Sequence, residues 1–320
     1  MHRYLFILAG FLLCLSAPSR AQVAVPELNP AAAQMFNSQF SIPMDLNYTT
    51  ANPALIQWGA PMRAGGGWFE GKSHDDVLMD SKKMSGQYGG GRISRERFSG
   101  AGEMGWLNLD YNLAPALVTI RHTSGNLAFA ALPNLAVGLG VNSDYKLLDT
   151  STNDIEDKIS SRGLGFSWRI GEQLFLGLAY GKDYLKRVVT ATPEVKGSRN
   201  FLMAGVGVRG GGNILWRIEA SRTTRKDFLG TTGNTIAPGS NLDQGSIEFG
   251  FSNLLFGYTL YSAQENLNGP KLKGSMADFA LAPMRGVGIS GRFEKNQVDT
   301  ATMAKAKSEQ IKSVNVTVLY

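Results

Sequence analysis

Cysteine is almost absent from this chain of 320 residues, which contains Cys14 and no other cysteine. Cys14 lies in an N-terminal apolar run that Arg3 precedes and Ser19-Arg20-Ala21 follows. This is the layout of a cleaved signal peptide, so residues 1–21 are predicted to be removed. The remaining chain then has no thiol for a disulfide, a metal site or nucleophilic catalysis.

Long apolar runs and blocks of basic residues are also missing. After the first 21 residues, no stretch approaches the roughly 20 apolar residues that a membrane helix needs. The formal net charge of +6 becomes +4 once Arg3 and Arg20 are removed, and the remaining Lys and Arg residues are scattered along the chain. A helical membrane protein is therefore excluded, and no nucleic-acid partner is predicted, because a basic stripe with interleaved aromatics is lacking.

Glycine and alternating apolar residues are abundant: the chain has 38 Gly and 10% aromatic residues. From residue 103 onward, large apolar side chains recur at every second position, opposite glycine, serine, asparagine and isolated charges. An apolar face that alternates with a polar face is typical of strands lying between lipid and a polar interior. The pattern predicts an all-β, antiparallel transmembrane β-barrel. Representative outward residues are Leu135, Val137, Leu139, Val141, Leu164, Phe166, Trp168, Ile170, Leu202, Ala204, Val206 and Val208.

The alternating segments also give an approximate strand number. Strands of roughly ten residues, beginning near Arg63, predict 12 or 14 strands over residues 61–320. Residues 87–93 and 276–282 are weaker candidates, and residues 71–102 are expected to form an early loop or a poorly patterned hairpin. Tight turns such as 171–173 alternate with long polar connections, predicted at 149–160 and 223–244. Short periplasmic turns and long outer loops indicate the outer membrane of a Gram-negative cell, with its lipid as a partner.

The C-terminus carries a specific signal of its own. Val314, Val316, Val318 and Tyr320 share one face of a terminal strand, and the chain ends on an aromatic ring. Barrel assembly machinery reads such an ending. Tyr320 is therefore predicted to be an assembly signal, and the assembly machinery to be a partner.

Residues 22–60 have a different composition, rich in Pro, Asn and Ala. Prolines at this spacing cannot lie inside a hydrogen-bonded strand ladder. A short apolar helix between them would have to pack against protein, inside or beneath the barrel. This segment is predicted to be an N-terminal plug or a periplasmic segment, with a flexible linker as the alternative.

One motif in this segment resembles a known family. Thr50-Ala51-Asn52-Pro53-Ala54-Leu55 resembles the N-terminal plug of the long-chain fatty-acid transporter family (FadL/OmpP1-like) of outer-membrane proteins. The resemblance implies a fourteen-stranded barrel, a plug containing Asn52 and Pro53, and entry of hydrophobic molecules from outside with sideways release through a gap in the wall. Related barrels serve as secretion scaffolds. The chain is shorter than the family and lacks its acidic, Ala- and Ser-rich run, so no ligand site is transferred.

Reactive residues are few. His122 and Ser124 lie two residues apart on one strand face, an arrangement that outer-membrane esterases use. The favoured interpretation is that residues 124–126 form a turn and His122 is an interfacial side chain, because no orienting carboxylate is identifiable. His74-Asp75-Asp76 has metal-ligand types without a partner cluster, so no metal is predicted. The Gly triplets at 65–67, 89–91 and 210–212 lack the Lys-Ser/Thr of a phosphate loop, so no cofactor is predicted.

Several charged residues fall on the predicted inner face. An unpaired ion in a dry interior would cost several kcal/mol, so these charges need water or one another. An open pore and a plugged barrel both meet that need. The leading hypothesis is passage of small, possibly hydrophobic, molecules without enzymatic activity, followed by a secretion or surface scaffold and then by a lipid-modifying esterase using His122 and Ser124. The inner charges are Arg169, Arg209, Arg217, Glu219, Glu248 and Arg292.

Overall fold

The computed structural model describes ten segments of the chain. They are residues 52–58, 62–75, 80–111, 116–150, 154–190, 192–251, 254–265, 271–284, 287–299 and 307–319. The elements, in chain order, are η1 (Pro53–Trp58), β1 (Met62–Asp75), β2 (Asp80–Arg95), β3 (Phe98–Tyr111), β4 (Ala116–Leu132), β5 (Leu135–Thr150), β6 (Asp154–Ile170), β7 (Leu174–Val189), β8 (Val195–Gly210), β9 (Leu215–Arg225), β10 (Phe228–Gly230), β11 (Thr235–Ala237), β12 (Ser240–Phe251), β13 (Leu254–Glu265), β14 (Lys271–Met284), β15 (Val287–Asp299) and β16 (Lys307–Leu319).

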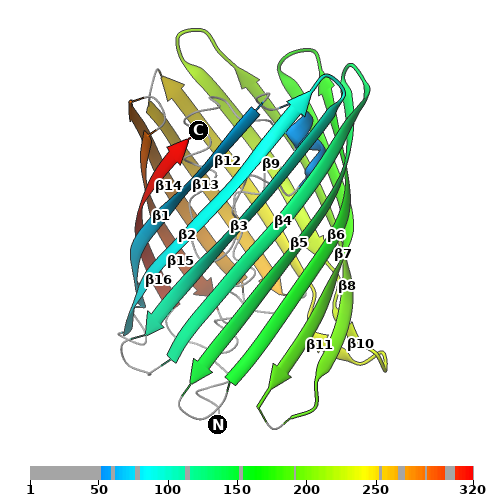
Figure 1. The fold of residues 1–320 in the computed structure, drawn as a ribbon, viewed down its shortest axis with the longest axis vertical. Coiled ribbons are helices and arrows are strands. Elements are labelled where there is room, and N and C mark those ends of the chain that lie inside the picture. The colour runs from blue at the N-terminus through cyan, green and yellow to red at the C-terminus, as the bar shows by residue number, and fades with distance from the viewer. Residues whose placement is uncertain are drawn as a thin grey trace.

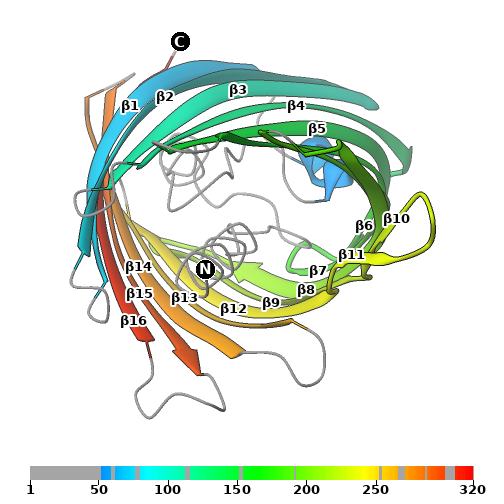
Figure 2. The same cartoon turned by 90° about the horizontal axis from the view of Figure 1, so that it is seen from below.

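The long strands form a closed antiparallel wall. Each pairs with its neighbours in sequence, β9 pairs with β12, and β1 pairs with β16. Because β8 also pairs with β9, the ladder returns to its starting point. Figures 1 and 2 show the resulting barrel, with the short β10–β11 hairpin beside β8. Within the described residues the wall has fourteen strands, so the barrel prediction is confirmed at the larger of the two predicted strand numbers.

The outer surface is apolar, as the alternation predicted. Leu139, Leu164, Trp168 and Leu202 are exposed on the outer face, whereas their strand neighbours such as Ser167 and Met203 are buried on the inner one. Apolar surface facing outward is unfavourable in water and favourable against acyl chains. The band is therefore the surface that a lipid bilayer would cover.

The strands are longer than predicted and continue past this band. On the outer face the band ends at a row of cross-strand neighbours, Arg162, Lys182 and Asn200. Beyond it, β5 still extends to Thr150 and β6 begins at Asp154, so the predicted long loop at 149–160 is wrong. Polar composition indicated that these residues leave the bilayer, but it did not show that their backbones stop pairing. Likewise, the predicted 223–244 connection contains the end of β9, the β10–β11 hairpin and the start of β12.

The early region is a hairpin rather than a loop. Within 71–102, residues 71–75, 80–95 and 98–102 belong to β1, β2 and β3, and β2 pairs with β3 without a break from Lys82 to Arg95. The weaker candidates 87–93 and 276–282 lie in β2 and β14. Short turns at 96–97, 133–134 and 171–173 meet at one end of the barrel, the upper end in Figure 1.

Some predictions fall outside the described residues. These include the signal peptide at 1–21, most of the segment 22–60, and Tyr320, together with the side chains of His74 and Arg292. In the part of the chain that the structure does describe, no helix is long and apolar enough to cross a membrane.

Candidate functional site: the inner surface of the barrel

The short helix η1 lies against the inner wall and begins at a side-chain cap. The backbone N–H of Ala54 donates to Oδ1 of Asn52 at 3.1 Å, and Pro53 occupies the first helical position. Both residue types are favoured at a helix N-terminus, because the amide oxygen satisfies a free N–H and proline has none to satisfy. The Nδ2 of Asn52 donates to the carbonyl of Phe166 on β6 at 2.7 Å. Asn52 therefore both caps η1 and attaches it to the wall.

Glycines in the wall make room for this helix. A Cβ atom added at Gly165 of β6 would lie 2.1 Å from Oδ1 of Asn52, and one added at Gly138 of β5 would lie 2.5 Å from the backbone of Pro53. Real Cβ atoms essentially never approach so closely. Figure 2 shows η1 inside the barrel beside these strands. The inner-face glycines therefore form a seat that a side chain would close.

The other end of η1 is attached to the β2–β3 turn, to β3 and again to β6. Nε2 of Gln57 donates to the carbonyl of Glu96 at 2.8 Å, and the hydroxyl of Ser99 donates to Oε1 of Gln57 at 3.0 Å. The Glu96 backbone has φ of 38°, a left-handed conformation that non-glycine residues rarely adopt. Nε1 of Trp58 donates to Oγ of Ser167 at 3.1 Å. The helix thus spans the inner wall from the β2–β3 turn to β6.

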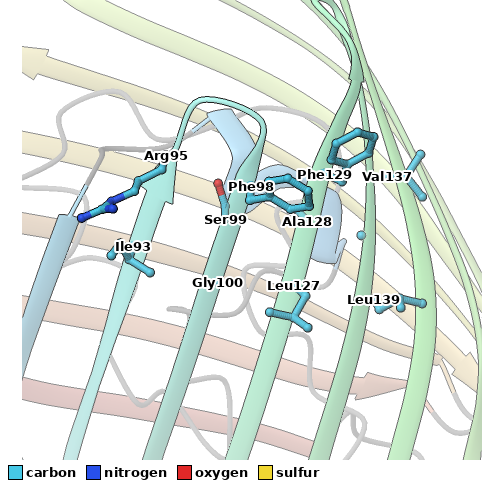
Figure 3. Close-up of a pocket in the computed structure, with 11 residues that line it drawn as sticks. Ile93, Arg95, Phe98, Ser99, Gly100, Leu127, Ala128, Phe129, Val137 and Leu139 are labelled. Atoms are coloured by element: carbon cyan, nitrogen blue, oxygen red, sulfur yellow. The ribbon is translucent and has the colours of Figure 1, made fainter.

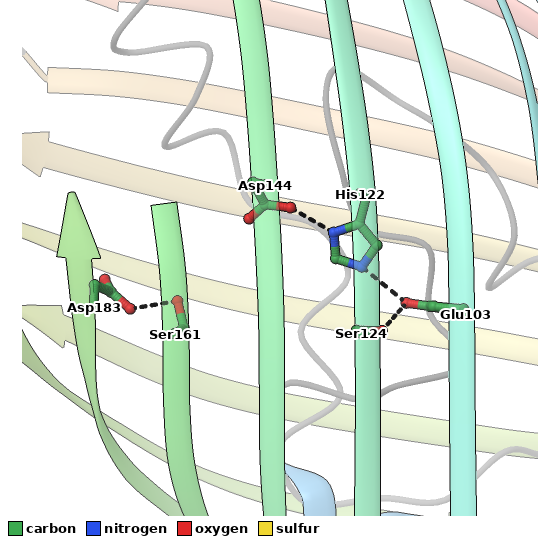
Figure 4. Close-up of polar contacts among 6 residues, drawn as sticks. All are labelled: Glu103, His122, Ser124, Asp144, Ser161 and Asp183. Carbon is green, nitrogen blue, oxygen red and sulfur yellow. Dashed lines mark hydrogen bonds and ion pairs between the residues drawn. The ribbon is translucent and has the colours of Figure 1, made fainter. Parts of the chain in front are cut away.

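His122 belongs to a polar cluster on the inner faces of β3, β4 and β5 (Figure 4). Its Nδ1 lies 2.5 Å from Oδ1 of Asp144, its opposite residue on β5, and its Nε2 lies 3.3 Å from Oε1 of Glu103. The hydroxyl of Ser124 donates to Glu103 at 3.1 Å. The imidazole is therefore held between two carboxylates.

This arrangement corrects the sequence interpretation of both residues. Ser124 lies within β4 rather than in a turn, and His122 is buried rather than interfacial. The esterase hypothesis requires the serine hydroxyl to donate to the imidazole. Ser124 instead donates to a carboxylate, and both ring nitrogens of His122 face carboxylate oxygens. The geometry therefore gives Ser124 no histidine base.

The predicted inner charges take different partners. Nη2 of Arg217 lies 2.6 Å from Oε1 of Glu248, with side chains 3% and 4% exposed. The guanidinium of Arg169 lies 5.0 Å from the ring centre of Trp58, and that of Arg209 lies 4.9 Å from the ring centre of Phe175. Glu219 is buried. Arg217 and Glu248 thus pair with each other, and Arg169 and Arg209 each lie against an aromatic ring.

Sequence reasoning missed several members of the inner network. Arg187 donates to both oxygens of Asp157, and Nε of Arg199 donates to Asp183 at 2.8 Å. Alternation shows which face a residue lies on, but these partners could be found only from the strand register, which shows which residues lie opposite each other. Once the 133–134 turn is fixed, antiparallel pairing places Asp144 opposite His122. Among the described residues, no group of three or more His, Cys, Asp or Glu side chains is arranged to hold a metal ion.

No protein-family model and no curated protein sequence matches the chain. Its fold is similar to solved structures at low sequence identity, among them the three that follow. The monoaromatic hydrocarbon channel CymD is 11% identical, with a TM-score of 0.59 over 92% of this chain and 97% of that one. A Pseudomonas aeruginosa FadL homologue is 12% identical, with a TM-score of 0.55 over 93% and 99%. The Pseudomonas putida toluene transporter TodX is 9% identical, with a TM-score of 0.54 over 93% and 98%.

Proposed function

We propose that this chain forms an outer-membrane channel for small hydrophobic molecules, in which η1 and the residues before it act as a plug. The observation that carries the proposal is the glycine seat on the inner wall, because it places a capped helix inside a closed barrel. The solved structures of similar fold include a monoaromatic hydrocarbon channel and a toluene transporter. We assign residues 1–21 to a signal peptide and residues 22–60 to the plug.

The inner surface supports a hydrophobic solute. Besides the ionic clusters, the inner face carries buried apolar side chains on both sides of the barrel. Moving aside the groups that cover these side chains would offer a solute apolar contacts, which favours an apolar solute over an ion. The residues concerned include Leu107, Leu109, Ile120, Phe201, Met203, Tyr261 and Met276.

The proposed route follows the lumen past η1. The resemblance noted in the sequence implies a gap in the wall for sideways release. However, the described residues of β2, β3 and β4 pair continuously, from Lys82 to Arg95 in β2 and from Phe98 to Asp110 in β3. Sideways release there would require strands to separate. Insertion would rely on the barrel assembly machinery, with Tyr320 as its signal.

Uptake of radiolabelled toluene tests the function. Cells whose outer membrane contains the barrel should take up toluene faster than cells without it, whereas uptake of labelled sucrose should be unchanged. Equal toluene rates, with the barrel verified in the outer membrane, would contradict the channel proposal and favour the scaffold alternative. Increased sucrose uptake would indicate an open aqueous pore instead.

A further inference from the structure

A groove lies on the outside of the barrel close to the β2–β3 turn (Figure 3). Its volume is about 550 Å³, and it crosses β2, β3, β4 and β5. It lies on the opposite side of the wall from η1, within the apolar outer band. The groove is thus separate from the lumen and from the proposed solute route.

Strand register explains the shape of the groove. On the outer face, Ile93, Gly100, Leu127 and Leu139 are successive cross-strand neighbours. Gly100 contributes no side chain, and the atom nearest to a Cβ placed there would be Cδ2 of Leu127, at 3.6 Å. The result is a depression whose walls are the side chains on either side.

Aromatic rings and a cation border the end of the groove nearest the turn. Phe98 and Phe129 lie opposite each other, with ring centres 5.0 Å apart. Arg95 lines the same end and is exposed, and it makes no ion pair with a described residue. Arg97 and Glu96 complete the turn, so its net formal charge is positive. An apolar groove with a cation at its end is complementary in shape and charge to an acyl chain joined to an anionic headgroup.

We propose that this groove binds an anionic phospholipid, with an acyl chain along Ile93, Gly100 and Leu127 and the phosphate at Arg95. Short turns of outer-membrane barrels face the periplasm, and the leaflet on that side of a Gram-negative outer membrane consists of phospholipid. A basic side chain at the edge of the apolar band lies at the depth of the headgroups, where it can bind a phosphate. The ligand class therefore follows from the charge and from the depth of Arg95.

Native mass spectrometry of the purified barrel tests this site. The barrel would be exchanged into detergent containing equal amounts of dioleoylphosphatidylglycerol and dioleoylphosphatidylethanolamine. The parent should retain the anionic lipid in preference. Arg95→Gln should reduce that retention by about fivefold, the equivalent of one basic side chain at a membrane surface. Gly100→Leu, which fills the depression from the lipid side, should reduce retention of both lipids.

Matched controls separate this site from general attraction. Arg162→Gln removes an exposed arginine from the outer face at the opposite edge of the band, away from the groove, and should leave lipid retention unchanged. Heat-dependent gel mobility verifies that each variant is folded. Equal retention of the two lipids by the parent, or unchanged preference in Arg95→Gln, would overturn the proposal. The result does not depend on transport, since a barrel that conducts nothing would still retain the lipid.

Discussion

Strands β9 and β12 carry two arginine–carboxylate pairs that differ in surroundings rather than in chemistry. Arg217 and Glu248 face the lumen, with side chains 3% and 4% exposed. Five residues along the same strands, Arg222 and Asp243 face outward beyond the apolar band, with side chains 66% and 50% exposed. Strand register creates both pairs equally. The two pairs have similar N–O distances but very different exposure to solvent. We therefore expect the burial of the side chains, rather than the distance between them, to decide how much each pair contributes to stability.

The physical reason is desolvation. A charge that loses its partner inside the barrel wall leaves the other charge buried, at a cost of several kcal/mol. A charge that loses its partner outside the band is solvated at once. Buried inner-face pairs such as Arg217–Glu248 are therefore expected to be sensitive to substitution, whereas exposed charges on the outer face of the projecting strand ends should tolerate it.

The largest effect is expected from Arg217→Met. This variant should lose about 3–5 kcal/mol of unfolding free energy, because Glu248 stays buried with one cation fewer. Urea titration of the barrel refolded in lipid vesicles would measure the loss. The double variant Arg217→Met/Glu248→Met should recover much of it. A comparable loss for Arg222→Met would contradict the argument that burial determines the cost of losing a partner.

The apolar band gives the second prediction. Val206→Arg on β8 should cost roughly 2–4 kcal/mol, because it places a charge against the acyl chains. Asn200→Arg is the matched control on the same strand and face, in the row where the band ends. It should have little effect. Equal costs in vesicle refolding would show that the edge of the band is misplaced.

The fold was largely predictable because lipid imposes one requirement on every strand. Leu164, Phe166 and Trp168 alternate for the same reason as residues in any other strand of the wall. The 149–160 segment was misassigned because alternation with lipid ceases where the strands leave the bilayer, although backbone pairing continues. The polarity of a segment indicates whether its side chains face lipid or water. It does not indicate whether its backbone is hydrogen-bonded to a neighbouring strand.

The site was less predictable because the inner face obeys no common rule. Asn52 and Pro53 were identified through a short resemblance, whereas Glu103 and Asp144 were not identified as partners of His122. These two carboxylates lie beside His122 only because of the β3–β4 and β4–β5 pairing registers. The sequence pattern does not fix those registers. Alternation placed glycines on the inner face, but only the fold brings Gly165 against Asn52.

The seat of η1 gives a third prediction, of intermediate size. Gly165→Val would overlap Asn52 and Pro53 and should cost about 1–3 kcal/mol, as overpacking of an interior does. It should also displace η1 and increase single-channel conductance in planar bilayers. Gly125→Val is the control, because the nearest atoms to a Cβ there lie 3.9 Å away. Unchanged conductance in a folded Gly165→Val barrel would contradict the plug.

The smallest effect is expected at the exposed rim, where Glu194 follows β7. Its carboxylate oxygens lie 2.8 Å from Nζ of Lys196 and 2.9 Å from Nζ of Lys186. Hydrogen bonds from Lys196 and then from Lys186 hold the pKa of Glu194 below its usual value. A lowered pKa in the folded state stabilises the fold at pH values above the unfolded pKa of about 4.3, and the contribution is lost as pH falls through the folded pKa.

Glu194→Gln should therefore lower the urea midpoint slightly at pH 7, and its difference from the parent should shrink as the pH falls below about 4.3. The shift at pH 7 should be smaller than for any substitution above, because all three side chains are in contact with water and salt screens them. The parallel variant Arg217→Met, measured at pH 7 in the same vesicles, sets the scale for a buried pair. If the effect of Glu194→Gln grew as pH fell, the sign of this linkage would be wrong. A shift as large as that of Arg217→Met would mean that exposure does not govern the worth of these pairs.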